Sequence, residues 1–149
     1  MTSLSEQLGS GEKRNAVVQD ALKVLDEEVA DKSGLTGLAI KGGYKVVQGI
    51  KPGFVRQVVE ALLDDFLKAL DPVYQEAVDK KRPAGAYLVE NKGRVADALL
   101  AVTDQKAERS SSGAIRGAYD KLRPLAKKQV EGAAPRLAAM LERHAAPTT

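Results

Sequence analysis

Residues 18–33 read V-Q-D-A-L-K-V-L-D-E-E-V-A-D-K-S, and residues 95–110 read V-A-D-A-L-L-A-V-T-D-Q-K-A-E-R-S. Six positions of this alignment are identical. In the first stretch the apolar residues recur at intervals of three and four, the spacing of one helix face, at Val18, Leu22, Leu25 and Val29. The pattern predicts an amphipathic helix that occurs twice in the chain.

A second match follows each copy of this helix. Residues 39–44 read A-I-K-G-G-Y and residues 114–119 read A-I-R-G-A-Y, so two tyrosines and two glycines stay in register. We therefore expect a duplication with repeat units 13–80 and 84–145. The expected fold is all-α, a single compact bundle of about six to seven helices in one domain over residues 1–149. The bundle should be pseudo-symmetric, because each unit would bury the apolar stripe of the other.

The matched motif has a packing interpretation. A glycine inside a helix costs about 1 kcal/mol relative to alanine, so glycines at matched positions favour close contact with a neighbouring helix. The predicted helix-contact or interaction residues are Ala39, Gly42, Gly43, Tyr44, Ala114, Gly117, Ala118 and Tyr119. A phosphate cradle formed by K-G-G-Y-K is the alternative, but neither G-x-x-x-x-G-K-[ST] nor G-x-G-x-x-G occurs in the chain.

Breaks in the apolar pattern set the expected helix boundaries. Proline and glycine interrupt the pattern at 51–53, Asp71-Pro72 resembles a helix start, and Pro135 should kink or divide the last helix. The expected helices cover about 13–32, 36–49, 55–70, 71–80, 92–109, 114–122 and 125–144, with a further helical pattern around Tyr87 and Leu88. The tail of 36–49 could also suit a strand. Residues 1–10 and 146–149 are expected to be flexible.

Composition excludes several classes of protein. The chain has no cysteine, a net charge of +3 and 44% hydrophobic residues. No apolar run approaches the roughly 18 residues that span a bilayer, and the N-terminus lacks the pattern of a secretory signal. We therefore expect a soluble, cytoplasmic protein without disulfides and without integral membrane association.

The sequence offers no recognisable catalytic chemistry. It contains a single histidine, His144, for which a role at a helix end suffices. Asp64 and Asp65 are adjacent, so on a helix they point about 100° apart and form no close carboxylate pair. We expect a protein that is not an enzyme, with no catalytic, cofactor-binding or metal-binding residues.

Two features keep nucleic-acid binding open as an alternative. Residues 29–44 resemble the helix-turn-helix of bacterial regulators, with an apolar-Ala pair, a turn glycine four residues later and Ile40 six residues after it. The second helix of that segment lacks the Arg, Asn and Gln side chains that read base edges well. Basic residues also gather in the second half, where candidate contacts to an anion or nucleic acid are Arg116, Lys121, Arg123, Lys127 and Lys128. A solvated surface is the plainer interpretation of this cluster.

Several strings point to a family. G-L-T-G-L-A-I-K-G-G-Y-K-V-V, I-K-P-G, L-L-D-D-F-L-K-A-L-D-P-V-Y and R-V-A-D-A-L-L-A-V-T-D resemble a family of small, uncharacterised all-helical bacterial proteins. The resemblance covers about residues 22–130. It implies a cytoplasmic, single-domain protein and transfers no catalytic residues.

These observations favour a non-enzymatic helical scaffold or protein-interaction module, whose partner is an unknown protein or a second copy of the chain. Nucleic-acid binding through the basic second half or through residues 29–44 is the alternative. A small-molecule or lipid pocket between the two units is a third option that the sequence cannot reveal. A structure distinguishes it, because the units either enclose a cavity or form a dry core.

Overall fold

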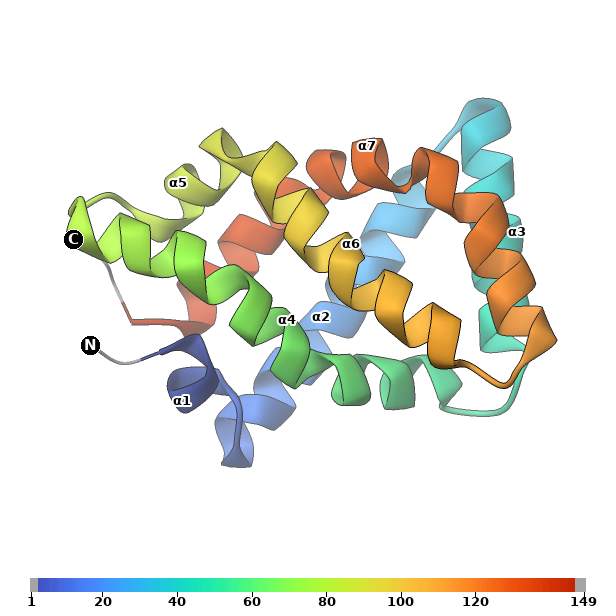
Figure 1. The fold of residues 1–149 in the computed structure, drawn as a ribbon, viewed down its shortest axis with the longest axis horizontal. Coiled ribbons are helices and arrows are strands. Elements are labelled where there is room, and N and C mark those ends of the chain that lie inside the picture. Colours follow the sequence, from blue (N-terminus) through green and yellow to red (C-terminus); the bar gives the residue numbers. More distant parts are fainter. Residues whose placement is uncertain (1–2, 147–149) are drawn as a thin grey trace.

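The computed structural model describes residues 3–146, and within them all regular structure is helical (Figure 1). The all-α fold class is therefore confirmed, and the tail of the 36–49 segment is helical rather than a strand. The elements are α1 (Leu4–Leu8), α2 (Gly11–Asp31), α3 (Gly34–Gln48), α4 (Phe54–Asp79), α5 (Ala84–Glu90), α6 (Lys92–Arg109) and α7 (Gly113–His144).

Two expected helix breaks do not occur. The helix α4 runs through Pro72, so the expected start at Asp71-Pro72 is wrong. The Asp71 carboxylate instead accepts a hydrogen bond of 2.9 Å from the backbone N–H of Leu4 and thereby caps α1. Helix α7 likewise continues through Pro124 and Pro135. Figure 1 shows that α7 changes direction along its length, as proline-containing helices do.

The N-terminal segment differs from the expected flexible stretch. Residues Leu4–Leu8 form α1, and both Leu4 and Leu8 are buried in the core. Their i, i+4 spacing places both leucines on one face, which packs mainly against α4. The expectation that residues 1–10 are flexible is therefore wrong at Leu4–Leu8. A helix of five residues is too short to give a periodicity signal in the sequence. Residues 1–2 and 147–149 of the expected flexible ends lie outside the described residues.

The long helices pack as crossed pairs. Helix α4 packs against α6, and α2 packs against α7 (Figure 1). The short helices α1 and α5 cover α4 and α7, respectively, at one end of the molecule. Helix α3 lies at the other end, where it packs mainly against α7.

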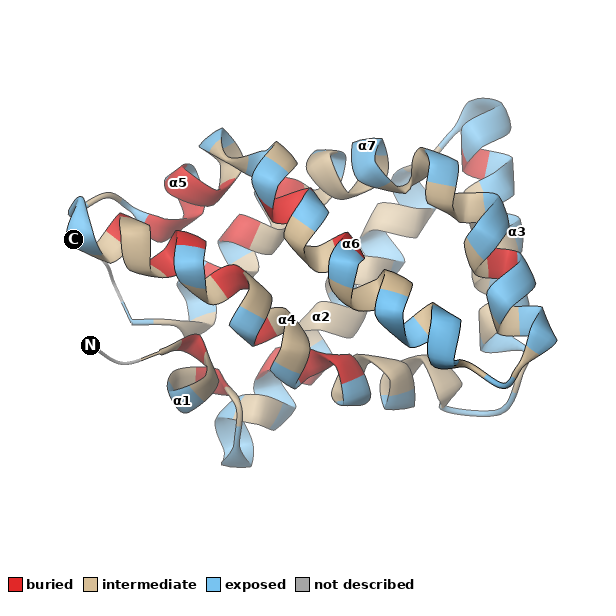
Figure 2. Cartoon of the chain, in the orientation of Figure 1, coloured by how far each residue is buried: buried red, intermediate tan, exposed pale blue. Residues whose placement is uncertain are grey.

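Burial is uneven along the molecule (Figure 2). The core cluster combines α1 and α5 with the second part of α4 and the end of α7, and its members include Leu8, Leu67, Tyr74, Leu88 and Leu141. On α3, by contrast, the only described residue that is buried is Gly37. The end of the molecule that contains α3 therefore lacks a dense core of its own.

Candidate functional site

The described residues form an apolar cavity of about 420 Å³ that is partly open to solvent. It lies between α2, α4 and α7, with single contributions from α1, α3 and α6. Its lining is almost entirely aliphatic and includes Ala21, Val24, Leu25, Val59, Phe66, Leu99, Ala126, Val130, Ala133, Leu137 and Met140. Four lining residues are polar or charged, namely Glu28, Lys32, Gln129 and His144.

Small side chains account for much of this space. Ala21 on α2 and Ala126 and Ala133 on α7 line the cavity at positions where a leucine would reach further inward. Val59 and Phe66, which belong to the apolar stripe of α4, border the same space and are only partly buried. This part of the apolar face of α4 therefore contributes to the cavity wall.

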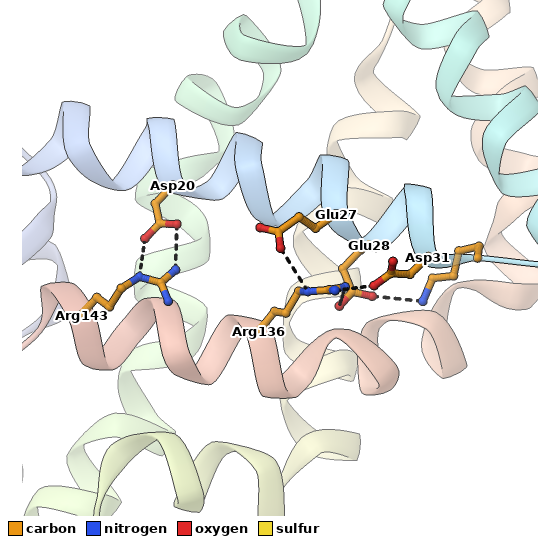
Figure 3. Close-up of polar contacts among 7 residues, drawn as sticks. Asp20, Glu27, Glu28, Asp31, Arg136 and Arg143 are labelled. Atoms are coloured by element: carbon orange, nitrogen blue, oxygen red, sulfur yellow. Dashed lines mark hydrogen bonds and ion pairs between the residues drawn. The ribbon is translucent and has the colours of Figure 1, made fainter.

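Ion pairs join the two helices that border the cavity. Helices α2 and α7 run side by side in opposite directions, and charged residues pair across them (Figure 3). Arg143 binds both carboxylate oxygens of Asp20, with distances of 2.9 Å from Nε and 2.7 Å from Nη2. Arg136 contacts Glu28 at 3.0 Å and also pairs with Asp31. This row of charges, the α2–α7 seam, is formed by Asp20, Glu27, Glu28, Asp31, Lys32, Arg136, Arg143 and His144.

The electrostatics of the seam favour the charged forms of Asp20 and Arg136. Burial alone would raise the pKa of Asp20, but hydrogen bonds from Arg143 and His144 hold that pKa below its usual value. The hydrogen bond to Asp31 raises the pKa of Arg136, so this guanidinium stays charged. Glu28 is only 13% exposed and has both Arg136 and Lys32 as partners. The seam therefore joins α2 to α7 by paired charges, while the apolar faces beneath it border the cavity.

One predicted contact glycine does allow a close helix approach. A Cβ on Gly43 would lie 2.7 Å from Cδ1 of Leu122 on α7, closer than real Cβ contacts allow. Leu122 and Ile40, both near this contact, line the cavity. Gly43 therefore brings α3 against α7 at one end of the cavity.

The two matched tyrosines make similar contacts. Tyr44 donates a hydrogen bond of 2.7 Å to Asp26 on α2, the helix before it. Tyr119 donates to Asp104 on α6, the helix before its own, and lies 2.7 Å from the hydroxyl of Thr103. Burial and the neighbouring carboxylate raise the pKa of Tyr119 to about 12 and raise that of Tyr44 as well. Both tyrosines therefore tie helices together as neutral donors.

The remaining predicted contact residues lie mostly on the surface. Ala39, Gly42, Ala114 and Gly117 are exposed, and Ala118 is buried. A Cβ on either Gly42 or Gly117 would meet no heavy atom within 4 Å among the described residues. These two glycines thus face away from the neighbouring helices, unlike Gly43.

The predicted basic contacts are partly engaged within the chain. Arg123 pairs with Asp104 at 2.8 Å and Lys127 pairs with Asp97 at 3.1 Å. Arg116 donates to the backbone oxygen of Ser110. For Lys121 and Lys128 no carboxylate partner lies within 4.0 Å in the described part of the chain.

A smaller, polar hollow adjoins the cavity. Its volume is about 290 Å³, and it shares Lys32, Leu125 and Gln129 with the apolar cavity. Ser33, Thr36 and Lys128 also line it. The space between α2, α3 and α7 is therefore apolar at its centre and polar where it reaches this end.

Three other features bear on metal, nucleic-acid and membrane binding by the described residues. Among residues 3–146 no group of three or more His, Asp or Glu side chains could hold a metal ion. The helix-turn-helix resemblance falls on α2 and α3, which are joined by Lys32 and Ser33, and α3 exposes Leu35, Leu38 and two lysines. Within the same described range, no helix is long and apolar enough to cross a membrane.

Sequence reasoning missed the cavity residues. Alanines are common in this chain, so Ala21, Ala126 and Ala133 carry no distinctive signal. Only the pairing of α2 with α7 puts them on facing surfaces, and that pairing joins residues more than 100 positions apart. A more informative signal was Glu28, an acid beside the apolar stripe of α2, which requires a partner when it is buried.

The fold and its hollow define an all-helical protein with an apolar cavity beneath a seam of paired charges. Residues 4–145 match DUF6918, a family of unknown function. The chain belongs to this family. No curated protein and no solved structure matches it.

Proposed function

We propose that the protein binds an apolar or amphipathic small molecule in the cavity between α2, α4 and α7. The observation that carries this proposal is the apolar space of about 420 Å³. Protein interiors are packed as densely as organic crystals, so an apolar space of this size is unusual. A ligand that covers its walls would gain about 25 cal/mol for each Å² of apolar surface removed from water.

Water is a poor occupant for such a space. A buried water needs two to four polar partners, but most of the wall is aliphatic. An apolar cavity of about 150 Å³ holds one benzene ring, so the space here suits about 15 to 20 carbon atoms by the same scale. A fatty acyl chain or an isoprenoid fits this capacity, with its polar end toward Lys32, Gln129 and the adjoining polar hollow.

The test is titration of the full chain with N-phenyl-1-naphthylamine, a sixteen-carbon dye whose fluorescence rises in apolar surroundings. We expect saturable binding and displacement of the dye by palmitate or by farnesol. The matched variants are Ala133→Phe, which fills the cavity, and Ala101→Phe on the exposed side of α6. Loss of dye binding in A133F alone supports the proposal. Absence of binding in the wild type, or equal binding in A133F, contradicts it.

The duplication inferred from the sequence is part of this proposal. Each half has a short helix followed by a long one, α1 with α2 and α5 with α6. The contacts of Tyr44 with Asp26 and of Tyr119 with Thr103, the residue aligned with Asp26, support equivalent positions in the two halves. A cavity between two related units would then arise from their shared apolar faces. Expression of residues 84–145 alone tests the argument, because an unpaired unit should remain largely unfolded.

The interaction-module hypothesis stays a second proposal. Exposed Gly42 and Gly117 support it, because each leaves a helix backbone open to a partner. Sedimentation velocity over a concentration series tests self-association. The non-enzymatic and cytoplasmic expectations also stay predictions. Nucleic-acid binding likewise stays a prediction, and a mobility shift at low salt tests it, with a steep loss of affinity as salt rises.

A further inference from the structure

Helix α3 exposes an apolar face to solvent. Leu35 is 86% exposed, Leu38 69% and Val46 48%, and these are the exposed large hydrophobic residues of the described chain. At 100° per residue they lie on one side of the helix with Ala39 and Gly42 between them. Three such side chains gathered on one helix of a small protein mark a contact surface rather than scattered surface residues.

The same helix is purely basic. From residue 32 to residue 59 the chain has five Lys and Arg residues and no Asp or Glu. Lys41 and Lys45 lie along one edge of the apolar face, beside Leu38, and are exposed. Neither these two lysines nor Lys51 has a carboxylate partner within 4.0 Å in the part of the chain that the structure describes.

We propose that the outer face of α3 docks on the surface of an anionic lipid bilayer, with Leu35, Leu38 and Val46 in the interface and Lys41 and Lys45 toward the lipid headgroups. An amphipathic helix with apolar residues flanked by lysines lies in this way in the plane of a membrane. The negative surface potential of such a membrane attracts nearby lysines. Each lysine raises the partition coefficient of the protein onto the membrane about five-fold.

Charge complementarity argues against a second copy on the same face. An α3–α3 contact would bring the lysines of both copies together, and the 32–59 stretch supplies no carboxylate to neutralise them. The phosphate groups of an anionic bilayer supply that countercharge. The exposed Gly42 leaves the centre of the face flat, as contact with a planar surface requires.

The position of α3 relates the docking face to the cavity. Ile40, on the protein-facing side of the helix, lines the apolar cavity. One helix therefore separates the cavity from the proposed membrane, so a lipid would have a short path between them. The docking proposal nevertheless goes beyond the proposed function, because vesicle binding requires only the outer face of α3.

The test is co-sedimentation of the full chain with sucrose-loaded vesicles of phosphatidylcholine alone or with 30% phosphatidylglycerol. We expect binding to the anionic vesicles, weakening of at least about ten-fold in 0.5 M salt, and little binding to the neutral ones. Leu35→Asp with Leu38→Asp should abolish binding, and Lys41→Gln with Lys45→Gln should reduce it about 25-fold. Lys23→Gln with Lys92→Gln, exposed lysines on α2 and α6, is the matched control and should bind as the wild type does.

The outcomes of this test distinguish the docking proposal from the proposed ligand binding in the cavity. Because Leu35 and Leu38 are exposed, L35D/L38D should keep the wild-type circular dichroism and the wild-type affinity for the naphthylamine dye. Failure of the wild type to bind anionic vesicles overturns the docking proposal but leaves ligand binding standing. Undiminished vesicle binding by L35D/L38D also overturns it. Self-association that L35D/L38D abolishes, without vesicle binding, assigns the face to a second copy instead.

Discussion

Replacing Ala133 by leucine should stabilise the ligand-free protein, because Ala133 borders the cavity of about 420 Å³. The new side chain brings three carbon atoms into contact with apolar surroundings. At about 0.8 kcal/mol for each methylene, the gross gain is about 2.4 kcal/mol. Fixing the leucine rotamer costs about 0.5–1 kcal/mol, which leaves a net gain of about 1.5 kcal/mol.

Ala138 on the same helix provides the matched control. Ala138 is 5% exposed and belongs to the packed core cluster, without bordering the cavity. A leucine there has no space to occupy and should destabilise the fold by about 1–3 kcal/mol. The two substitutions are chemically identical and lie five positions apart on α7, so they should change stability in opposite directions.

Urea unfolding followed by far-ultraviolet circular dichroism measures both changes. The thermal midpoint should rise by about 3–6 °C in A133L, because 1 kcal/mol moves it by about 2–4 °C in a chain of this size. The dye-binding affinity of A133L should fall at the same time, because leucine occupies part of the space. If A133L loses stability as A138L does, the space beside Ala133 is already filled and the reasoning fails.

Two further comparisons test the helix contacts. Gly42→Ala should add about 0.5–1 kcal/mol of stability by helix propensity. The stability gained by Gly43→Ala should be smaller by about 1 kcal/mol, because its Cβ meets Leu122. Equal effects of the two substitutions in thermal melts would contradict the close approach of α3 to α7. Asp20→Asn should cost about 1 kcal/mol at neutral pH, because it removes the charge bound by Arg143. The pKa of Asp20 is lowered on folding, so this stabilisation is present above the ordinary value of 3.8 and is lost as the pH falls below it. If Asp20→Asn still lowers the free energy of unfolding at pH 2, the charge of Asp20 is not the source of the stabilisation.

The helices were predictable from the sequence to the extent that local signals mark them. Ser110 to Ser112 separate α6 from α7, in agreement with the break expected between 109 and 114, and α6 has the bounds that its apolar period indicates. Proline misled the prediction at Pro72 and Pro124, where α4 and α7 are continuous. A local rule states what proline costs a helix, and only the packing of the whole chain decides whether that cost is offset.

The candidate site was much less predictable. Tyr44 and Tyr119 stood out because they are rare and matched, and both make contacts between helices. The cavity depends on which helix faces which, and on where alanines meet across that interface. Arg136 illustrates the difference, since in the sequence it is one basic residue of a charged segment. In the structure it pairs with Glu28 and Asp31, which lie 108 and 105 positions away.

The seam between α2 and α7 explains how a helix pair can border a hollow and remain associated. Two helices held by apolar side chains close any space between them, because the attraction grows with the area in contact. Paired charges along one edge, such as Asp20 with Arg143 and Glu28 with Arg136, fix the spacing of the helices without filling the space beneath them. Partly buried ion pairs of this kind contribute more to a defined geometry than to net stability. The arrangement therefore agrees with the proposal that a ligand occupies the cavity.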